Sequence, residues 1–215
     1  KNTFGKQCDY NTTIEFIVDD LPEAFAIPTS LITVCDDEAN PVNQDGIYSF
    51  NTTSFQNTIL GTQTGMIVNY FDGNGNPLPS PLPNPFLSAT QNIRVEVLNP
   101  LNTTCKAYLT IPLVVQPVPE IELYGDELVC SNNPLFTKVI NAGLLDETTV
   151  SNYTYQWFLN NNPISGETNY TLTVNTEGIY TVEITNSNGC VRTRTLTVTA
   201  SDIATINDIE IVDLS

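Results

Sequence analysis

The residues of this chain that could carry chemistry are carboxylates and cysteines, because the sequence contains no histidine. Ser-His and Cys-His pairs are therefore impossible, and the commonest general base and the usual zinc ligand are missing. Paired carboxylates could still act as acid and base. Most other familiar mechanisms are excluded, so we expect a protein that is not an enzyme.

Two acidic segments carry the oxygen ligands that calcium prefers. Asp72-Gly73-Asn74-Gly75-Asn76 resembles the start of an EF-hand loop, but the twelfth position holds Pro83 instead of glutamate. We interpret it as a hairpin turn. Asp36-Asp37-Glu38, with Asp45 nearby, is either a solvated acidic loop or a calcium site at a domain junction. We expect no cofactor, and calcium at the junction is the open alternative.

The chain has 215 residues and is strongly acidic, with 7 Lys plus Arg against 24 Asp plus Glu and a net charge of −17. A nucleic-acid-binding surface needs clustered positive charge, which is absent here. No apolar run approaches the roughly 20 residues that cross a bilayer. We therefore predict no nucleic-acid partner and no direct membrane insertion.

Short segments of alternating apolar and polar residues recur between turns rich in Asn, Gly and Pro. This pattern, without an amphipathic helix, predicts half-buried strands and an all-β fold. Residues 124–145 are less regular, and we expect a short helical turn there. The predicted strands cover residues 13–18, 31–34, 66–71, 93–97, 107–115, 120–123, 153–159, 170–174, 180–185 and 192–199.

An internal repeat groups these strands into modules. Asn69-Tyr70-Phe71 and Gln156-Trp157-Phe158 each lead into an Asn-rich turn, and each is followed by a Val-Glu strand, a turn and a cysteine. We predict tandem immunoglobulin-like β-sandwich domains, the second of them PKD-like. The predicted units are the closing strands of a preceding module at residues 1–20, complete modules at 21–117 and 118–200, and a linker with the first strand of another module at 201–215.

The modules suggest how the five cysteines pair. We predict one disulfide inside each complete module, Cys35 with Cys105 and Cys130 with Cys190, joining the first strand to the last hairpin. Each would stabilise its module by about 4 kcal/mol. Cys8 is left over, either for a partner in the preceding module or as a reactive thiol or an intermolecular link. Paired cysteines indicate an oxidising compartment.

The sole tryptophan, Trp157, lies on a central predicted strand. We expect it in the core of the second module. The alternative is an exposed platform, formed with Phe158, that stacks on a sugar ring.

Several segments resemble the repeated modules of large flavobacterial surface proteins exported by the type IX secretion system, including gliding-motility adhesins. In the first module these segments are Thr33-Val34-Cys35-Asp36-Asp37, Asp45-Gly46, residues 58–66 and residues 76–86. The second module is similar to the bacterial immunoglobulin-like domains beside them, through Tyr155-Gln156-Trp157, residues 178–182 and Asn188-Gly189-Cys190. Residues 201–210 resemble the lead-in to the last such domain before a type B sorting signal.

The resemblance implies a non-catalytic stalk segment of a secreted adhesin, attached to the outer membrane and used in surface attachment or gliding. Its partners would be an unidentified extracellular surface or glycan and the type IX translocon proteins. One alternative is a spacer or carbohydrate-binding module of a secreted polysaccharide-degrading enzyme. Another is a substrate or component bound to the type IX outer-membrane translocon.

Overall fold

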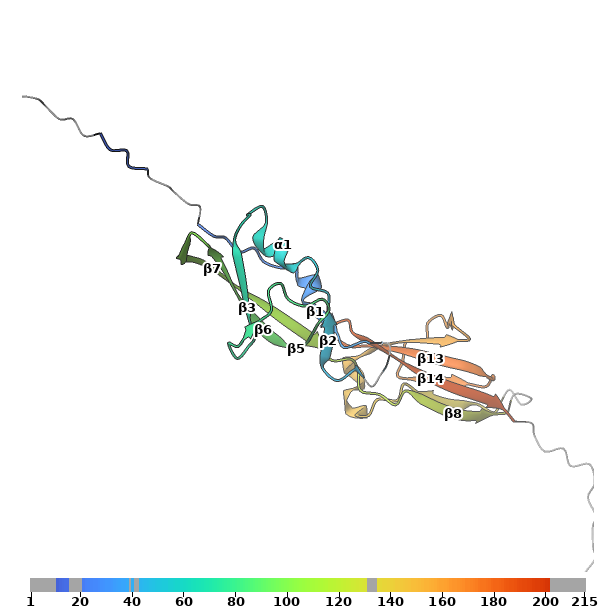
Figure 1. The fold of residues 1–215 in the computed structure, drawn as a ribbon. Helices are drawn as coiled ribbons and strands as arrows, with labels where there is room; N and C mark the ends of the chain where they lie inside the picture. Colours follow the sequence, from blue (N-terminus) through green and yellow to red (C-terminus); the bar gives the residue numbers. More distant parts are fainter. Residues whose placement is uncertain (1–10, 16–20, 39, 41–42, 131–134, 202–215) are drawn as a thin grey trace, which may run out of the picture.

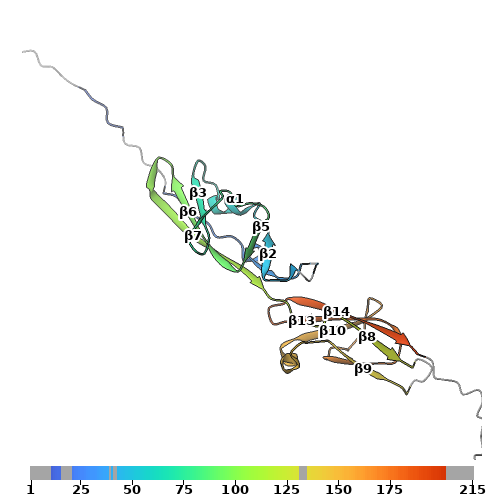
Figure 2. The ribbon, with the colours of Figure 1, turned by 60° about the horizontal axis from the view of Figure 1, so that its bottom comes forward.

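The computed structural model describes residues 11–15, 21–38, 40, 43–130 and 135–201. These residues form two β-sandwich domains placed end to end (Figures 1 and 2). The prediction of an all-β fold with tandem immunoglobulin-like domains is confirmed. The predicted fragments at residues 1–20 and 201–215 lie outside the described residues, Cys8 included, except for residues 11–15 and 201.

The first domain packs a five-stranded sheet against a two-stranded one. The large sheet has the order β1-β7-β6-β3-β4, and β2 pairs with β5 in the small sheet. A short helix, α1 (Phe55–Leu60), connects the two sheets between β2 and β3. The strands are β1 (Thr33–Cys35), β2 (Ile47–Phe50), β3 (Ile67–Phe71), β4 (Pro77–Leu78), β5 (Phe86–Ala89), β6 (Gln91–Asn99) and β7 (Asn102–Gln116).

The second domain repeats this arrangement strand for strand. Its large sheet has the order β11-β10-β13-β14-β8, and β12 pairs with β9. The 3-10 helix η3 (Glu147–Asn152) stands where α1 stands in the first domain. The strands are β8 (Tyr124–Val129), β9 (Lys138–Asn141), β10 (Thr154–Leu159), β11 (Asn162–Pro163), β12 (Thr171–Val174), β13 (Gly178–Thr185) and β14 (Val191–Ala200).

Strand direction is also the same in both domains. The first strand pairs in parallel with the last strand, β1 with β7 and β8 with β14, whereas the other pairs are antiparallel. The register agrees at the sheet centre, where Tyr70 lies opposite Val95 and Trp157 lies opposite Val182. Tyr70 and Trp157 are therefore equivalent positions.

Each domain has its own hydrophobic core. Alternate residues of the central strands face inward, as the period of two requires, so that Val95 and Val182 are fully buried. The core of the first domain consists of Ile27, Ile32, Phe50, Phe55, Ile59, Val68, Tyr70, Leu82, Ile93, Val95, Val97, Ile111, Leu113 and Val115. That of the second consists of Ile121, Val129, Ile140, Ala142, Leu144, Tyr155, Trp157, Leu172, Val174, Tyr180, Val182, Ile184, Leu196 and Val198.

Some predicted elements differ from the observed ones. Residues 13–15 of the strand expected at 13–18 are not in a strand, and 16–18 lie outside the described residues. The strand expected at 120–123 is β8 at Tyr124–Val129 instead, and only Ile121 forms an isolated bridge, with Leu144. The helical turn expected within 124–145 is not found among the described residues of that stretch, and the nearest helix is η3, at Glu147–Asn152.

Candidate functional site

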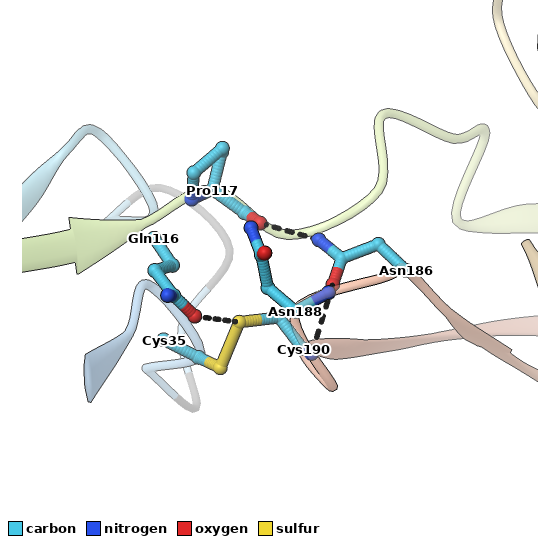
Figure 3. The surroundings of a disulfide bond; sticks show 6 residues. All are labelled: Cys35, Gln116, Pro117, Asn186, Asn188 and Cys190. Atoms are coloured by element: carbon cyan, nitrogen blue, oxygen red, sulfur yellow. Dashed lines mark hydrogen bonds between the residues drawn. A yellow bond between two sulfur atoms is a disulfide. The ribbon is translucent and has the colours of Figure 1, made fainter. Parts of the chain in front are cut away.

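A disulfide bond joins the two domains where they meet (Figure 3). Cys35 ends β1 of the first domain, and Cys190 lies in the turn between β13 and β14 of the second. The two residues are 155 positions apart in the sequence, and their Cα atoms are 5.5 Å apart.

The predicted pairing of Cys35 with Cys105 and of Cys130 with Cys190 is wrong. Cys35 lies opposite Gln116, at the end of β7, because β1 and β7 are parallel. Cys105 lies eleven residues earlier on that same strand, roughly 35 Å away at about 3.3 Å per residue. A disulfide needs Cα atoms within about 7 Å, so the two cysteines of this domain are at opposite ends of the sandwich and cannot meet.

The same geometry separates Cys130 from Cys190 in the second domain. Cys130 follows β8, at the end of the sandwich where the parallel strand β14 also ends, whereas Cys190 precedes β14. Among the described residues, Cys105 and Cys130 are unpaired. The prediction correctly placed its cysteines beside the first strand and on the last hairpin. The predicted pairing was wrong because it did not take into account that the first and last strands of each domain are parallel.

The turn that carries Cys190 is built around the side chain of Asn186. Its Oδ1 atom accepts hydrogen bonds from the backbone N–H groups of Asn188 and Cys190, both at 3.0 Å. Gly189, at φ +83°, completes the turn in a conformation that favours glycine. The Asn186 Nδ2 atom donates to the carbonyl oxygen of Pro117 at 2.9 Å. One side chain thus fixes both the cysteine and the inter-domain linker (Figure 3).

The linker itself is held against the second domain. Val118 and Pro119 are buried, and Arg192 donates from Nη1 to the carbonyl oxygen of Pro119 at 3.2 Å. Gln116 Oε1 lies 3.5 Å from the Cys190 sulfur. This is a contact and not a hydrogen bond, because a sulfur in a disulfide carries no hydrogen. Cys190 is fully buried, so the bond is shielded from solvent on that side.

The acidic segment beside Cys35 has a structural role in the joint. Asp36 is buried, and its Oδ2 atom accepts a hydrogen bond from the Gly46 N–H at 2.7 Å. Partial burial, a hydrogen bond with Asp36 and the charges of neighbouring aspartates raise the pKa of Glu38. Asp37 and Glu38 line one side of a cleft, and the second domain, including Arg192, lines the other. No three metal-ligating side chains of the described residues are grouped closely enough to hold an ion.

The other acidic segment is a turn, as predicted. Asp72 Oδ1 accepts hydrogen bonds from the backbone N–H groups of Asn74 and Asn76, and its Oδ2 accepts from the Asn76 side chain. The hydrogen bond from the Asn76 side chain is the main reason that the pKa of Asp72 is lowered. Gly75 adopts φ +86°.

Trp157 lies in the core, as predicted. Its side chain is fully buried, and Nε1 donates to the carbonyl oxygen of Asn169 at 2.9 Å. It therefore cannot offer a face to a sugar. No helix in the described part of the chain is long and apolar enough to cross a membrane. The absence of enzymatic activity remains a prediction.

Comparison with known proteins identifies one family, the Flavobacterium inter-domain disulphide bond domain, whose model matches residues 31–119. The match covers most of the first domain and the linker to the second. No curated protein matches the chain.

Several solved structures are similar at low identity, and some of them are proteins of immunoglobulin domains. The insect immune protein hemolin is 14% identical over 83% of this chain, with a TM-score of 0.34, and this chain spans 46% of its length. The Ig1-2 module of the Drosophila receptor tyrosine phosphatase DLAR is 11% identical over 83% of this chain and 96% of its own length, with a TM-score of 0.31. A Bacteroides ovatus protein, SGBP-B, in complex with a mixed-linkage heptasaccharide, is 14% identical over 90% of this chain and 48% of its own length, with a TM-score of 0.24.

Proposed function

We propose that this pair of domains is part of the non-catalytic stalk of a secreted, cell-surface adhesin of a flavobacterium, used in surface attachment or gliding. In this role the domains hold a binding region at a set distance and direction from the cell. The observation that carries the proposal is the Cys35–Cys190 bond, which joins two domains that already have separate cores.

A covalent bond across the joint matters most where orientation or resistance to force is needed. Each domain buries its own apolar residues, so neither depends on the other for a core. The bond, together with the hydrogen bonds of Asn186 and Arg192 to the linker, restrains bending between them. The family matched by residues 31–119 is named for an inter-domain disulfide, which agrees with this role.

The bond also supports a location outside the cytoplasm, because structural disulfides persist in oxidising compartments. The large negative charge suits an exterior surface that resists self-association. Export by the type IX system and attachment to the outer membrane are part of the proposal and rest on the resemblance of the first module to such surface proteins. The bound surface or glycan would then contact other domains.

Domain replacement in the parent protein tests the proposal. Residues 21–200 are exchanged for an unrelated disulfide-joined pair of β-sandwich domains of equal length, and attachment and gliding of the cells are measured. A stalk tolerates the exchange, whereas deletion of the same residues reduces attachment because the tip is brought closer to the cell. Loss of attachment in the exchanged protein, with normal surface exposure, would show instead that this segment binds the target itself.

A further inference from the structure

Cys130 occupies the same place in the second domain as Cys35 does in the first. Cys35 lies opposite Gln116, where the parallel first and last strands end together. In the second domain the pairing reaches Val129 opposite Ala200. One step further along this register brings Cys130 beside Ser201. Cys130 is therefore the equivalent of the bonded Cys35.

Cys105 occupies the place of the other bonded cysteine. Counting back eleven residues from Gln116 along β7 leads to Cys105, and counting back eleven from Ser201 leads to Cys190. Both residues lie beside the turn of the last hairpin, at the end of the sandwich opposite the one where the first and last strands end together. The two unpaired cysteines thus repeat, position for position, the two that are bonded to each other.

The unpaired cysteines also lie at the free ends of the pair of domains. The start of β7 and the tip of β8 are at opposite outer ends, far from the joint, in both views (Figures 1 and 2). Cys105 is partly exposed, whereas its equivalent Cys190, in the joint, is fully buried. Cys130 is partly exposed, as is its bonded equivalent Cys35. The exposure of Cys105 is expected if the surface that would cover it belongs to another domain.

We propose that Cys105 and Cys130 each form an inter-domain disulfide of the same kind as Cys35–Cys190. Cys105 bonds to the first-strand cysteine of a domain that precedes it, and Cys130 bonds to the last-hairpin cysteine of a domain that follows. The inference rests on the proposed function in one respect, that further domains of this type adjoin the pair. It makes every joint of the stalk covalent.

Each bond forms by thiol–disulfide exchange. The two thiols lose two protons and two electrons to a disulfide oxidant, which is reduced to two thiols, and one S–S bond replaces two S–H bonds. A disulfide oxidoreductase of the export compartment or glutathione disulfide can serve as this oxidant. Neither cysteine needs a catalytic neighbour, because the oxidant supplies the exchange chemistry.

A lengthened chain tests Cys130. Residues 1–201 are followed directly by a second copy of residues 117–200, which reproduces the observed connection from Gln116 to Pro117. Cys8→Ser and, in the added copy, Cys130→Ser remove the other thiols. After refolding in a glutathione redox buffer, free thiols are counted by mass spectrometry of the maleimide-labelled chain.

If Cys130 bonds to the Cys190 of the added copy, one free thiol remains, Cys105, and peptide mapping without reduction finds the Cys130–Cys190 pair. If it does not, three thiols remain and the inference is overturned. The 215-residue Cys8→Ser chain should keep two free thiols, Cys105 and Cys130. The Cys35–Cys190 pair in every chain verifies folding. Because this assay measures only bond formation, it can fail while the domain-replacement test of the stalk succeeds.

A second chain tests Cys105. Residues 1–201 with Cys8→Ser are followed by a second copy of residues 20–201, so that the last domain of the first copy precedes the first domain of the second. A bond between the Cys130 of the first copy and the Cys105 of the second leaves two free thiols. Four free thiols would overturn the inference for Cys105, even if the first experiment supports it for Cys130.

Discussion

Tyr70 and Trp157 occupy equivalent positions at the centres of the two large sheets, but their polar groups have different surroundings. In the second domain the Trp157 Nε1–H donates to Asn169, whereas in the first domain the Tyr70 hydroxyl is buried without a hydrogen-bond partner among the described residues. Burial raises the pKa of Tyr70 to about 12. A buried polar group without a partner costs about 1–3 kcal/mol.

These two positions therefore predict opposite effects of the same change. We expect Tyr70→Phe to leave the unfolding free energy of the first domain unchanged or to raise it, by up to about 1–3 kcal/mol, because it removes an unpaired hydroxyl. Trp157→Phe should lower that of the second domain by at least about 1 kcal/mol, because it leaves a cavity and an unpaired carbonyl group. Urea unfolding, monitored separately for each domain, measures both changes in unfolding free energy. A large decrease for Tyr70→Phe would show that the Tyr70 hydroxyl has a hydrogen-bond partner.

Glu38 makes stability depend on pH near the joint. Its pKa in the folded chain is raised above the ordinary value of 4.5, first by burial and then by the neighbouring carboxyl groups. The folded state therefore binds the proton more tightly than the unfolded state. Its contribution to stability is fully present below pH 4.5 and is lost as the pH rises through the raised pKa.

We expect Glu38→Gln to raise the melting temperature at pH 7 and to reduce the decrease in stability between pH 4.5 and 7. Calorimetry across this range measures the effect, and Glu23→Gln, an exposed carboxylate of the same domain, is the matched control. If stability falls equally with pH in Glu38→Gln and in the original chain, Glu38 is not the group that causes the decrease.

At the scale of elements, the turn that follows β9 packs directly on β14. Gly143 has φ +73°, and a Cβ atom there would lie 1.7 Å from Nη1 of Arg194. That buried arginine bonds to Glu122 at 3.1 Å. The turn can therefore approach the sheet only because residue 143 has no side chain.

Gly143→Ala should destabilise the second domain by more than the roughly 1–2 kcal/mol that a left-handed conformation costs an L-residue, because Arg194 must also move. Gly166→Ala is the matched control, since Gly166 has φ +84° but nothing within 4 Å of the added Cβ. The difference between the two variants in urea unfolding isolates the clash. Equal decreases in unfolding free energy for the two variants would mean that Arg194 moves aside at no cost in stability.

The elements that sequence reasoning found are those with clear alternation. The predictions at 93–97 and 180–185 lie within β6 and β13, where inward apolar and outward polar residues alternate. β8 escaped prediction because its apolar residues Tyr124 and Leu128 are 75% and 63% exposed, on the outer face. An edge strand with this pattern carries no usable period.

The site could be predicted only in part, for a reason that also lies in the elements. The positions of Cys35 and Cys190, beside a first strand and on a last hairpin, follow from the local pattern. Which ends of the sandwich they occupy depends on the direction of β1 relative to β7 and of β8 relative to β14. Direction depends on long-range pairing and leaves no local signal, so the partners of the cysteines could not be predicted.

For the whole molecule, the disulfide matters more for orientation than for folding. Closing a loop of 155 residues would stabilise a single cooperative unit by roughly 5 kcal/mol in the chain-entropy model. Here the loop contains two domains with separate cores, so little of this value is available to either one. The bond instead restrains the relative motion of two domains that are otherwise connected by residues 117–120 and by the hydrogen bonds of Asn186 and Arg192 to that linker.

We therefore predict that Cys35→Ser with Cys190→Ser leaves both domains folded but broadens the distribution of angles between them. Small-angle X-ray scattering should give a wider ensemble of shapes, and single-molecule stretching should show the joint extending before either domain unfolds. Cys105→Ser with Cys130→Ser, which removes two thiols without touching the joint, should scatter like the original chain. Identical scattering from both double variants would mean that the hydrogen bonds of Asn186 and Arg192 hold the domains without the bond, and Asn186→Ala in the Cys35→Ser background would then be the change that releases them.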